Sequence, residues 1–284
     1  MTERNTKKRI KKWLAIVLAT LFALLATGLA FCLGVPYQLR TWKNWQPDYE
    51  KLDITALLEK ENLLDEEYET LYRQTGLTRL AIDDMRGEEQ GKQRICAIQK
   101  YLFDGATPNG RYASPIMYID ETSTYATLAY LQDGDILVTA TTVVSWWRFG
   151  HAALVVDADK GLLLESIGVG VESKYNASTV FCNLANFMVL RPKASAETKA
   201  QVVAYARANL LNLPYSATIG ILSKKNPENI RSTQCAHLVW YAYKRFGIEL
   251  DSNGGGLVVP RDIANSTELE LVQAFGFNLD RLWK

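Results

Sequence analysis

The chain opens with a basic cluster followed by a long apolar run. Residues 1–12 carry six Lys and Arg side chains, and the next 23 residues, 13–35, contain no charged residue. A helix rises ~1.5 Å per residue, so this run is long enough to cross a hydrocarbon core of ~30 Å. A cleaved signal peptide is the competing interpretation, but its apolar region spans only ~7–15 residues. We expect an uncleaved single-pass anchor, with its basic end in the cytoplasm and residues after 35 outside the cell membrane.

Helical spacing dominates the next segment, residues 36–112. From Asp48 to about Gln99, leucines and tyrosines recur at helical intervals among many acidic residues, without a proline. Gly76 is a plausible helix stop, and Asn109-Gly110 predicts a turn beyond the last helix. We interpret this segment as a helical arm that holds the following domain off the membrane or packs beside it.

The pattern changes to short apolar runs in residues 113–284. A turn at 157–161 separates two of these runs and predicts a hairpin. Short strands joined by hairpins favour an antiparallel sheet. The predicted strands cover residues 136–139, 152–156, 162–167 and 187–190.

Two helices are expected among these strands. Ser195 can cap a helix that runs to about Leu211, and Ser232 or Thr233 can cap a second helix over residues 234–246. We therefore predict an α+β fold in which an antiparallel sheet packs on the second helix, preceded by the transmembrane helix and the arm.

Composition narrows the partners and cofactors. The formal net charge of the 284 residues is +1, which gives no bulk attraction to nucleic acid. Of four cysteines, Cys32 lies in the apolar run, so an odd number remains outside it and at least one thiol is free. A disulfide between Cys96 and Cys182 stays an alternative in an oxidising compartment. No Cys or His set has metal-ligand spacing, so we expect neither a metal nor another cofactor.

Candidate chemistry centres on Cys235, which falls in the first turn of the second predicted helix. The positive end of a helix stabilises a thiolate, which is the nucleophilic form of cysteine. The chain has two histidines. His237 lies two residues from Cys235 and points to a different helix face, so we assign it to packing or pocket lining. His151 begins a predicted strand and can approach from across the core.

Glu165 completes the predicted site. It lies on the strand that pairs with the His151 strand, where a carboxylate can accept a hydrogen bond from the second ring nitrogen. The residues predict a nucleophile at Cys235, a base at His151 and an orienting acid at Glu165. The backbone amide of Cys235 is a natural donor to an oxyanion. Trp147, beside His151, is a candidate pocket wall, a membrane contact or a core residue.

The order of these motifs resembles the circularly permuted papain-like hydrolases of the NlpC superfamily, in particular the YiiX-like group. The resemblance covers about residues 131–264, and Ala236 departs from it because the family often has serine after the cysteine. The resemblance implies a permuted papain-like fold and the same three catalytic residues, and it suggests Tyr215 as a helper of the oxyanion. The motifs are Gly134-Asp-Ile-Leu, Gly150-His-Ala-Ala-Leu-Val-Val, Leu164-Glu-Ser, Cys235-Ala-His-Leu-Val-Trp-Tyr-Ala-Tyr and Pro260-Arg-Asp-Ile.

These features predict a membrane-anchored cysteine hydrolase that works outside the cytoplasm. The resemblance favours an amide bond of a peptidoglycan peptide as the substrate. Two alternatives stay open: an amidase or acyltransferase of the same fold that acts on acylated lipid, and a noncatalytic, membrane-tethered binding or scaffold domain.

Overall fold

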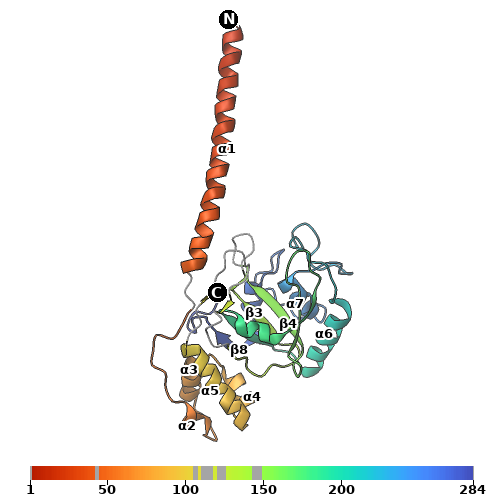
Figure 1. The fold of residues 1–284 in the computed structure, drawn as a ribbon. Coiled ribbons are helices and arrows are strands. Elements are labelled where there is room, and N and C mark those ends of the chain that lie inside the picture. Colours follow the sequence, from red (N-terminus) through yellow and green to blue (C-terminus); the bar gives the residue numbers. More distant parts are fainter. Residues whose placement is uncertain are drawn as a thin grey trace. The chain divides into compact units, whose positions relative to one another are not determined.

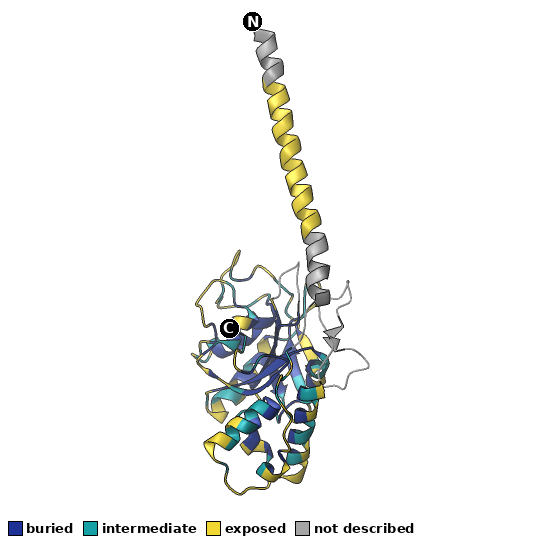
Figure 2. Cartoon of the chain, turned by 90° about the vertical axis from the view of Figure 1, so that its left-hand side faces the viewer, coloured by how far each residue is buried: buried dark blue, intermediate teal, exposed yellow. Residues whose placement is uncertain are grey.

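The chain forms two compact units, residues Met1–Trp42 and Lys43–Lys284. The computed structural model describes residues 2–41, 45–104, 108–109, 118–119, 126–142 and 149–283. The first unit contains the helix α1 (Thr2–Thr41), drawn in red in Figure 1. Its segment Arg9–Ala30 is long and apolar enough to cross a membrane, and the residues of that segment are exposed (Figure 2). An apolar N-terminal helix was expected over 13–35 and is present.

The segment expected as a helical arm is broken into four helices. They are α2 (Thr55–Leu58), α3 (Asp65–Thr75), α4 (Arg79–Met85) and α5 (Glu89–Asp104). Gly76 ends α3 with a φ of 73°, as predicted. A short antiparallel pair, β1 (Pro108–Asn109) and β2 (Tyr118–Ile119), follows α5.

The expected start of the helical pattern at Asp48 is wrong, because residues 45–54 form no helix. Side chains of α3 and α5 satisfy the backbone there instead. Gln74 accepts a hydrogen bond from the Leu52 amide at 2.9 Å and donates to the Glu50 carbonyl at 3.0 Å, while Gln99 donates to the Leu52 carbonyl at 2.8 Å. These bonds replace the helical ones and hold the segment extended against α3 and α5.

The second unit is built on a six-stranded sheet in the order β6-β5-β4-β3-β7-β8, in which every pairing is antiparallel. The four predicted strands and the predicted hairpin are confirmed, and β6 and β8 are additional. The strands are β3 (Ile136–Thr139), β4 (His151–Asp157), β5 (Leu162–Glu165), β6 (Lys174–Ala177), β7 (Phe187–Pro192) and β8 (Leu269–Phe275).

Helices cover both faces of the sheet, because successive side chains of a strand point to opposite sides. Ile136 and Val138 pack with α6 (Ala196–Asn209) and α7 (Cys235–Lys244), whereas Leu137 packs with α2–α5. Figure 1 shows these helices around the sheet, and Figure 2 shows the buried strands between them. The result is an α+β unit with three layers. Two short helices, η1 (Ser178–Asn183) and α8 (Pro260–Ala264), lie in its connections.

A buried ion pair ties α4 to the sheet. Arg191 of β7 donates to the carboxylate of Asp135 at 2.9 Å and to that of Asp84 at 2.6 Å. Its side chain is 7% exposed, so the guanidinium depends on both acids for charge compensation. This contact joins the beginning of β3, where Asp135 lies, to the helices on the far face.

The helix caps divide into one confirmed and one wrong prediction. Ser195 caps α6 by accepting from the Thr198 amide at 3.1 Å, as expected. Neither Ser232 nor Thr233 caps α7. Gln234 does so by accepting from the Ala236 amide at 3.0 Å, because the Thr233 hydroxyl instead meets a histidine ring one turn along α7.

Candidate active site

The first residue of β4 is His151, and the backbone before it forces a tight turn. Gly150 has a φ of 77°, which favours glycine. A Cβ atom at this position would lie 2.3 Å from the Thr139 carbonyl oxygen and 2.4 Å from the ring of Trp283. Only glycine fits this turn, and the turn sets the point at which His151 enters the sheet.

A hydrogen-bonded series crosses three strands from His151. Its Nε2 atom lies 2.7 Å from Oε2 of Glu165 on β5, and Oε1 of Glu165 accepts from the Asn176 side chain on β6 at 2.7 Å. The register pairs Leu154 with Leu164, so Glu165 reaches His151 along a diagonal of the sheet. Both carboxylate oxygens are therefore engaged, which fixes the orientation of the acid.

Aromatic packing fixes the other side of the imidazole. Phe181 of η1 stacks on the His151 ring with a centroid separation of 6.2 Å and an interplanar angle of 26°. Phe181 is fully buried. The ring is therefore held by Glu165 at its Nε2 edge and by Phe181 on a face, which leaves Nδ1 for Cys235.

Cys235 is the first residue of α7 and is 8% exposed. Its thiol lies 3.3 Å from the side-chain oxygen of Gln234, the residue that caps the helix. Gln234 is itself held by a hydrogen bond to the Val258 carbonyl. Within the described residues the Cys235 amide donates no hydrogen bond, so it remains available to an oxyanion.

The electrostatics of His151 link it to both partners. Burial alone disfavours the imidazolium and lowers the pKa of His151, but hydrogen bonds and charge interactions with Cys235 and Glu165 outweigh burial and raise that pKa to about 10. The pKa of Glu165 is lowered: burial raises it, and the His151 ring overcomes this by hydrogen bonding to the carboxylate. The structure thus brings the three sequence-predicted residues together and favours a charged imidazole between a thiol and a carboxylate.

Tyr215 lies beside the same thiol. Its backbone is bridged to Thr233, where the Ser216 amide donates to the Thr233 carbonyl at 2.7 Å. Burial, together with the nearby charge of Cys235, raises the pKa of Tyr215 to about 12, so the phenol keeps its proton near neutral pH. A neutral phenol near the thiol can donate a hydrogen bond to an oxyanion.

His237 lies apart from this group. Its Nε2 atom donates to the Lys225 carbonyl at 2.7 Å, and its Nδ1 atom lies 3.0 Å from the Thr233 hydroxyl. It stacks on Tyr241 with a centroid separation of 5.6 Å. Burial lowers the pKa of His237 to about 4; the hydrogen bond to the Lys225 carbonyl opposes this effect, and the nearby positive charge of Lys225 adds to it. The structure assigns it to packing, while the candidate wall residue Trp147 lies outside the described residues.

A pocket of about 110 Å³ opens at Cys235 and His151. Four loops and the first residues of β4, α7 and α8 form its walls, and most of the side chains that line it are apolar. The lining residues are Thr142, Phe149, Gly150, His151, Ile167, Tyr215, Ala217, Gln234, Cys235, Leu257, Val259 and Pro260.

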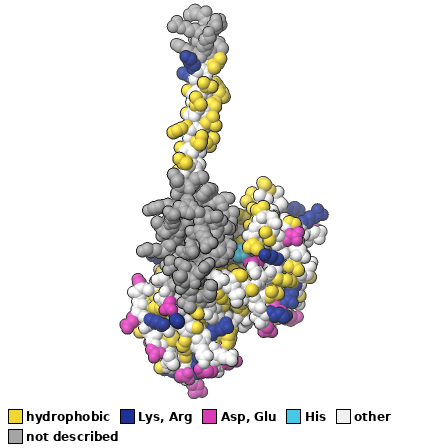
Figure 3. Space-filling model, in the orientation of Figure 1, with side chains coloured by type: hydrophobic (Ala, Val, Ile, Leu, Met, Phe, Trp, Pro, Cys, Tyr) yellow, Lys and Arg dark blue, Asp and Glu magenta, His cyan; other side chains and the backbone are white. Residues whose placement is uncertain are grey.

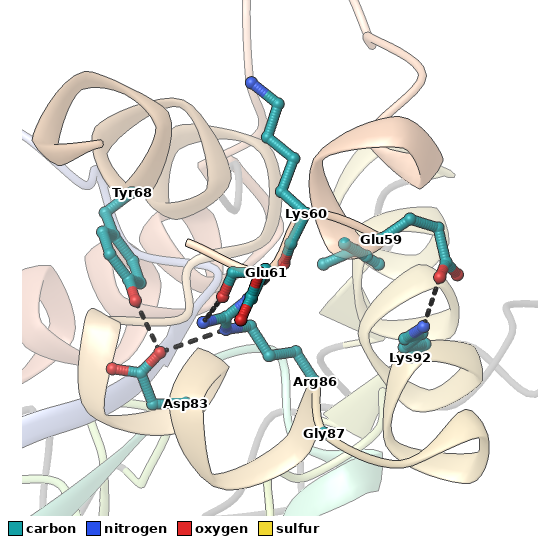
Figure 4. A pocket seen from close by; sticks show the side chains of 9 residues that line it. Glu59, Lys60, Glu61, Tyr68, Asp83, Arg86, Gly87 and Lys92 are labelled. Atoms are coloured by element: carbon teal, nitrogen blue, oxygen red, sulfur yellow. Dashed lines mark hydrogen bonds and ion pairs between the residues drawn. The ribbon is translucent and has the colours of Figure 1, made fainter. Parts of the chain in front are cut away.

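A second, more polar cavity of about 470 Å³ lies among the helices α2–α5 (Figure 4). Its charged side chains bind one another. Arg86 donates to Asp83 at 3.3 Å, Tyr68 donates to the same carboxylate at 2.6 Å, and Lys92 pairs with Glu59 at 2.6 Å. Because these charged groups already pair with one another, they leave few free hydrogen-bonding groups for a ligand.

Thiols and acids elsewhere form no second centre in the described part of the chain. Cys96 and Cys182 are free thiols, and burial raises the pKa of each. Among the described residues no group of three or more His, Cys, Asp or Glu is placed to hold a metal ion. The chemistry of the described residues therefore gathers at Cys235.

Sequence reasoning missed three residues of this site: Asn176, Phe181 and Gln234. Asn176 lies on β6, a short and largely exposed strand without the alternation that marks a half-buried strand. Phe181 lies in a 3-10 helix, and Gln234 is not among the usual capping residues. The signal that could have found Gln234 is its position immediately before Cys235, the first residue of α7.

Comparison with known proteins gives one relative to report. The chain is 31% identical over 137 residues to the uncharacterized protein YycO of Bacillus subtilis (strain 168), a match that covers 47% of this chain and 52% of that protein. The chain thus spans about half the length of the curated relative it matches. No family model matches the chain, and no solved structure matches it.

Proposed function

We propose that this protein is a membrane-anchored cysteine hydrolase whose nucleophile is Cys235. One observation carries the proposal: Cys235, His151, Glu165 and Asn176 form a continuous series from the N-terminus of α7 across three strands, beside a pocket. A nucleophile, a base and an oriented acid in this order make up the general arrangement of covalent acyl transfer.

In the proposed reaction His151 holds the proton of the Cys235 thiol from the start, so a thiolate lies beside an imidazolium. The thiolate attacks the substrate carbonyl, and the Cys235 amide and the Tyr215 hydroxyl donate hydrogen bonds to the resulting oxyanion. The imidazolium then protonates the leaving amine or alcohol, and a thioester remains on Cys235. His151 next takes a proton from water, hydroxide attacks the thioester, and the acid product leaves as the Cys235 thiolate is restored beside the imidazolium.

The permuted papain-like fold of the NlpC superfamily, YiiX-like group, is part of the proposal. Its support is the chain order, in which the histidine strand β4 precedes the cysteine helix α7, together with an antiparallel sheet packed on that helix. The placement of Glu165 next to the histidine agrees with the role that the resemblance implies.

The substrate expected from the resemblance is an amide bond of a peptidoglycan peptide. The pocket favours the second candidate, an acylated lipid. Phe149, Ile167, Leu257 and Val259 line it, and apolar walls match an acyl chain better than the polar backbone of a peptide. An amide or ester of a fatty acid is therefore the substrate class that the pocket lining supports.

The proposed location is the cell membrane, with the second unit outside the cytoplasm. Its support is the apolar segment Arg9–Ala30 and the basic residues that precede and begin it. An anchored enzyme remains close to both candidate substrates, the cell wall and the bilayer.

Labelling of Cys235 tests the enzymatic part of the proposal. The full chain in detergent is treated with an acyl-mimicking electrophile, and the labelled cysteine is identified by mass spectrometry. We expect rapid labelling at Cys235 that His151→Ala slows strongly, while Cys96 and Cys182 serve as internal controls for ordinary thiols. Slow labelling that is indifferent to His151 would reject the enzyme and favour the binding or scaffold alternative.

Product analysis separates the two substrates. The full chain and its Cys235→Ala variant are each incubated with peptidoglycan and, separately, with vesicles that contain N-acyl and O-acyl lipids. Release of fatty acid that depends on Cys235 supports the lipid candidate, and release of peptides supports the wall candidate.

A further inference from the structure

Exposed apolar side chains lie on loops that line the Cys235 pocket. We call Phe149, Val169, Val171, Ile221 and Leu222 the apolar rim. Val169 is 82% exposed, Leu222 is 80% exposed and Ile221 is 61% exposed. Of the eight large hydrophobic residues that are exposed in the described part of the second unit, these five belong to the rim. Such a concentration marks an interaction surface rather than scattered surface hydrophobics.

Hydrogen bonds and close packing hold the rim loops around the pocket. The loop after β5 is joined to the segment that follows α6, because the Ser173 amide donates to the Leu213 carbonyl at 2.8 Å. The loop that carries Ile221 and Leu222 packs on another, since a Cβ on Gly220 would lie 1.9 Å from the Gly256 carbonyl oxygen. Both loops also contribute lining residues, Ile167 and Ala217, so the rim and the pocket wall are continuous.

The position of the rim in the chain points to a lipid bilayer as its partner. The helix α1 ends at Thr41 and the second unit begins at Lys43, so the apolar segment that can cross a membrane is linked to this unit by a short connection. The second unit of an anchored chain therefore remains close to the bilayer surface. An apolar surface held there lowers its free energy by inserting into the lipid boundary.

Charges beside the rim suit a bilayer with anionic headgroups. Lys174 and Lys224 are exposed, and neither forms an ion pair with another described residue, while the exposed acid Glu172 lies between Val171 and Lys174 in the sequence. In Figure 3 hydrophobic atoms lie along the upper right edge of the second unit, where Figure 1 shows the loops after α6, and Lys and Arg side chains lie beside them. Apolar tips flanked by lysines are the usual composition of an interfacial membrane contact.

We propose that the apolar rim inserts into the surface of the lipid bilayer and turns the mouth of the Cys235 pocket toward it. The inference rests on the membrane anchor of the proposed function and adds an orientation to it. A substrate then passes from the bilayer into the pocket between Phe149 and the two rim loops without crossing water. Wall peptides would reach this mouth only after the rim has left the lipid.

Photo-crosslinking in vesicles tests this orientation without using the chemistry of the site. The photoreactive amino acid p-benzoylphenylalanine replaces Ile221 in the full chain, and in a matched control it replaces Leu64, which is also 61% exposed but lies before α3. The chains are placed in vesicles of phosphatidylethanolamine and phosphatidylglycerol (about 3:1), irradiated and analysed by mass spectrometry. We expect lipid adducts at position 221 to exceed those at 64 by about fivefold or more, and a third replacement at Val169 to behave like that at Ile221.

Equal adduct yields at 221 and 64 would overturn the proposal, and so would crosslinks at 221 that join two copies of the chain instead of chain and lipid. Circular dichroism of each chain verifies that it is folded, and the exposed loop positions should tolerate the replacement. Cys235 labelling is measured on the same samples. Lost lipid adducts with rapid labelling reject the rim alone, whereas lipid adducts with slow labelling reject the hydrolase and leave the rim intact.

Discussion

The two histidines lie on opposite sides of α7, and their pKa values are shifted in opposite directions. Where α7 meets β4, His151 lies between a thiol and a carboxylate, and its pKa is raised to about 10. Where α7 meets the loop around Lys225, His237 lies between a carbonyl and a hydroxyl, and its pKa is lowered to about 4. Both rings are buried, so burial does not distinguish them.

The difference shows that the charge of the partners, rather than depth, decides what a buried histidine can do. Burial lowers the pKa of both rings, and only the interactions of His151 with Glu165 and Cys235 reverse that effect. A ring that stays neutral packs, and a ring held charged beside a thiol can move protons. The predictions below separate these roles.

The largest expected effect is on the pH dependence of Cys235 labelling. In His151→Ala the thiol loses its proposed base, and an ordinary thiol with a pKa near ~8.5 is only ~1% ionised at pH 6.5. We expect labelling at pH 6.5 to slow about 100-fold and then rise about tenfold per pH unit up to ~8.5. The wild-type rate should change little over this range, because the imidazolium persists below about pH 10. Parallel pH profiles for the two chains would contradict a charge pair between the Cys235 thiolate and the His151 imidazolium.

His237 should affect stability instead. Its folded pKa of about 4 lies below the unfolded value of ~6.5, so the unfolded chain takes up a proton that the folded chain refuses as the pH falls between these values. Lowering the pH from 7 to 4.5 should therefore cost the wild type about 2–3 kcal/mol more than it costs His237→Gln. Urea unfolding of the full chain in detergent at both pH values measures this. Equal losses would mean that His237 does not resist protonation, and Cys235 labelling at pH 7 should be the same in both chains.

Glu165→Gln sharpens the contrast by replacing the carboxylate partner of His151 with a neutral amide. The amide can keep a hydrogen bond to Nε2, but the charge that favours the imidazolium is lost. We expect Cys235 labelling at pH 6.5 to fall about tenfold, less than in His151→Ala. A matched control is Glu172→Gln, which removes an exposed acid from the neighbouring loop. If both substitutions leave the rate unchanged, Glu165 does not hold the imidazole charged.

The smallest expected effect concerns Asn176, a positioning residue that acts through Glu165. Asn176→Ala removes the hydrogen bond to Oε1 and leaves the carboxylate and its charge in place. Labelling should slow about threefold, because only part of a hydrogen bond to a charged group, worth ~1.5–3 kcal/mol, reaches the thiol through Glu165 and His151. The double variant with Glu165→Gln should be no slower than Glu165→Gln alone, because Asn176 has then lost the group it positions. Additive losses would show that Asn176 acts by another route.

The sequence predicts the parts of this unit in which one local rule decides. The apolar run at 136–139 coincides with β3, and the turn after Asp157 produces the predicted hairpin. Two histidines in 284 residues also leave few candidates, so the approach of His151, Glu165 and Cys235 to one another is predicted before any coordinates. The spacing of apolar residues predicts the strands, and the small number of histidines predicts the site.

Tertiary contacts decide the remainder. Thr233 satisfies the local rule for a cap, yet its hydroxyl serves His237, and the longer Gln234 side chain takes the cap. The extended course of residues 45–54 depends on Gln74 and Gln99, which are distant along the chain. The role of Asn176 depends on the pairing of β6 with β5, and the polar residues of β6 do not predict that pairing.

The cover that α2–α5 place on the sheet has a practical consequence for protein production. The strands have two apolar faces, and side chains such as Leu137, Val155 and Val189 lie under those helices. A truncated chain that starts at residue 113 would carry every residue of the Cys235 site but leave this second face to water, where it would drive aggregation. The shortest soluble form worth expressing therefore starts near Lys43, at the boundary between the two units.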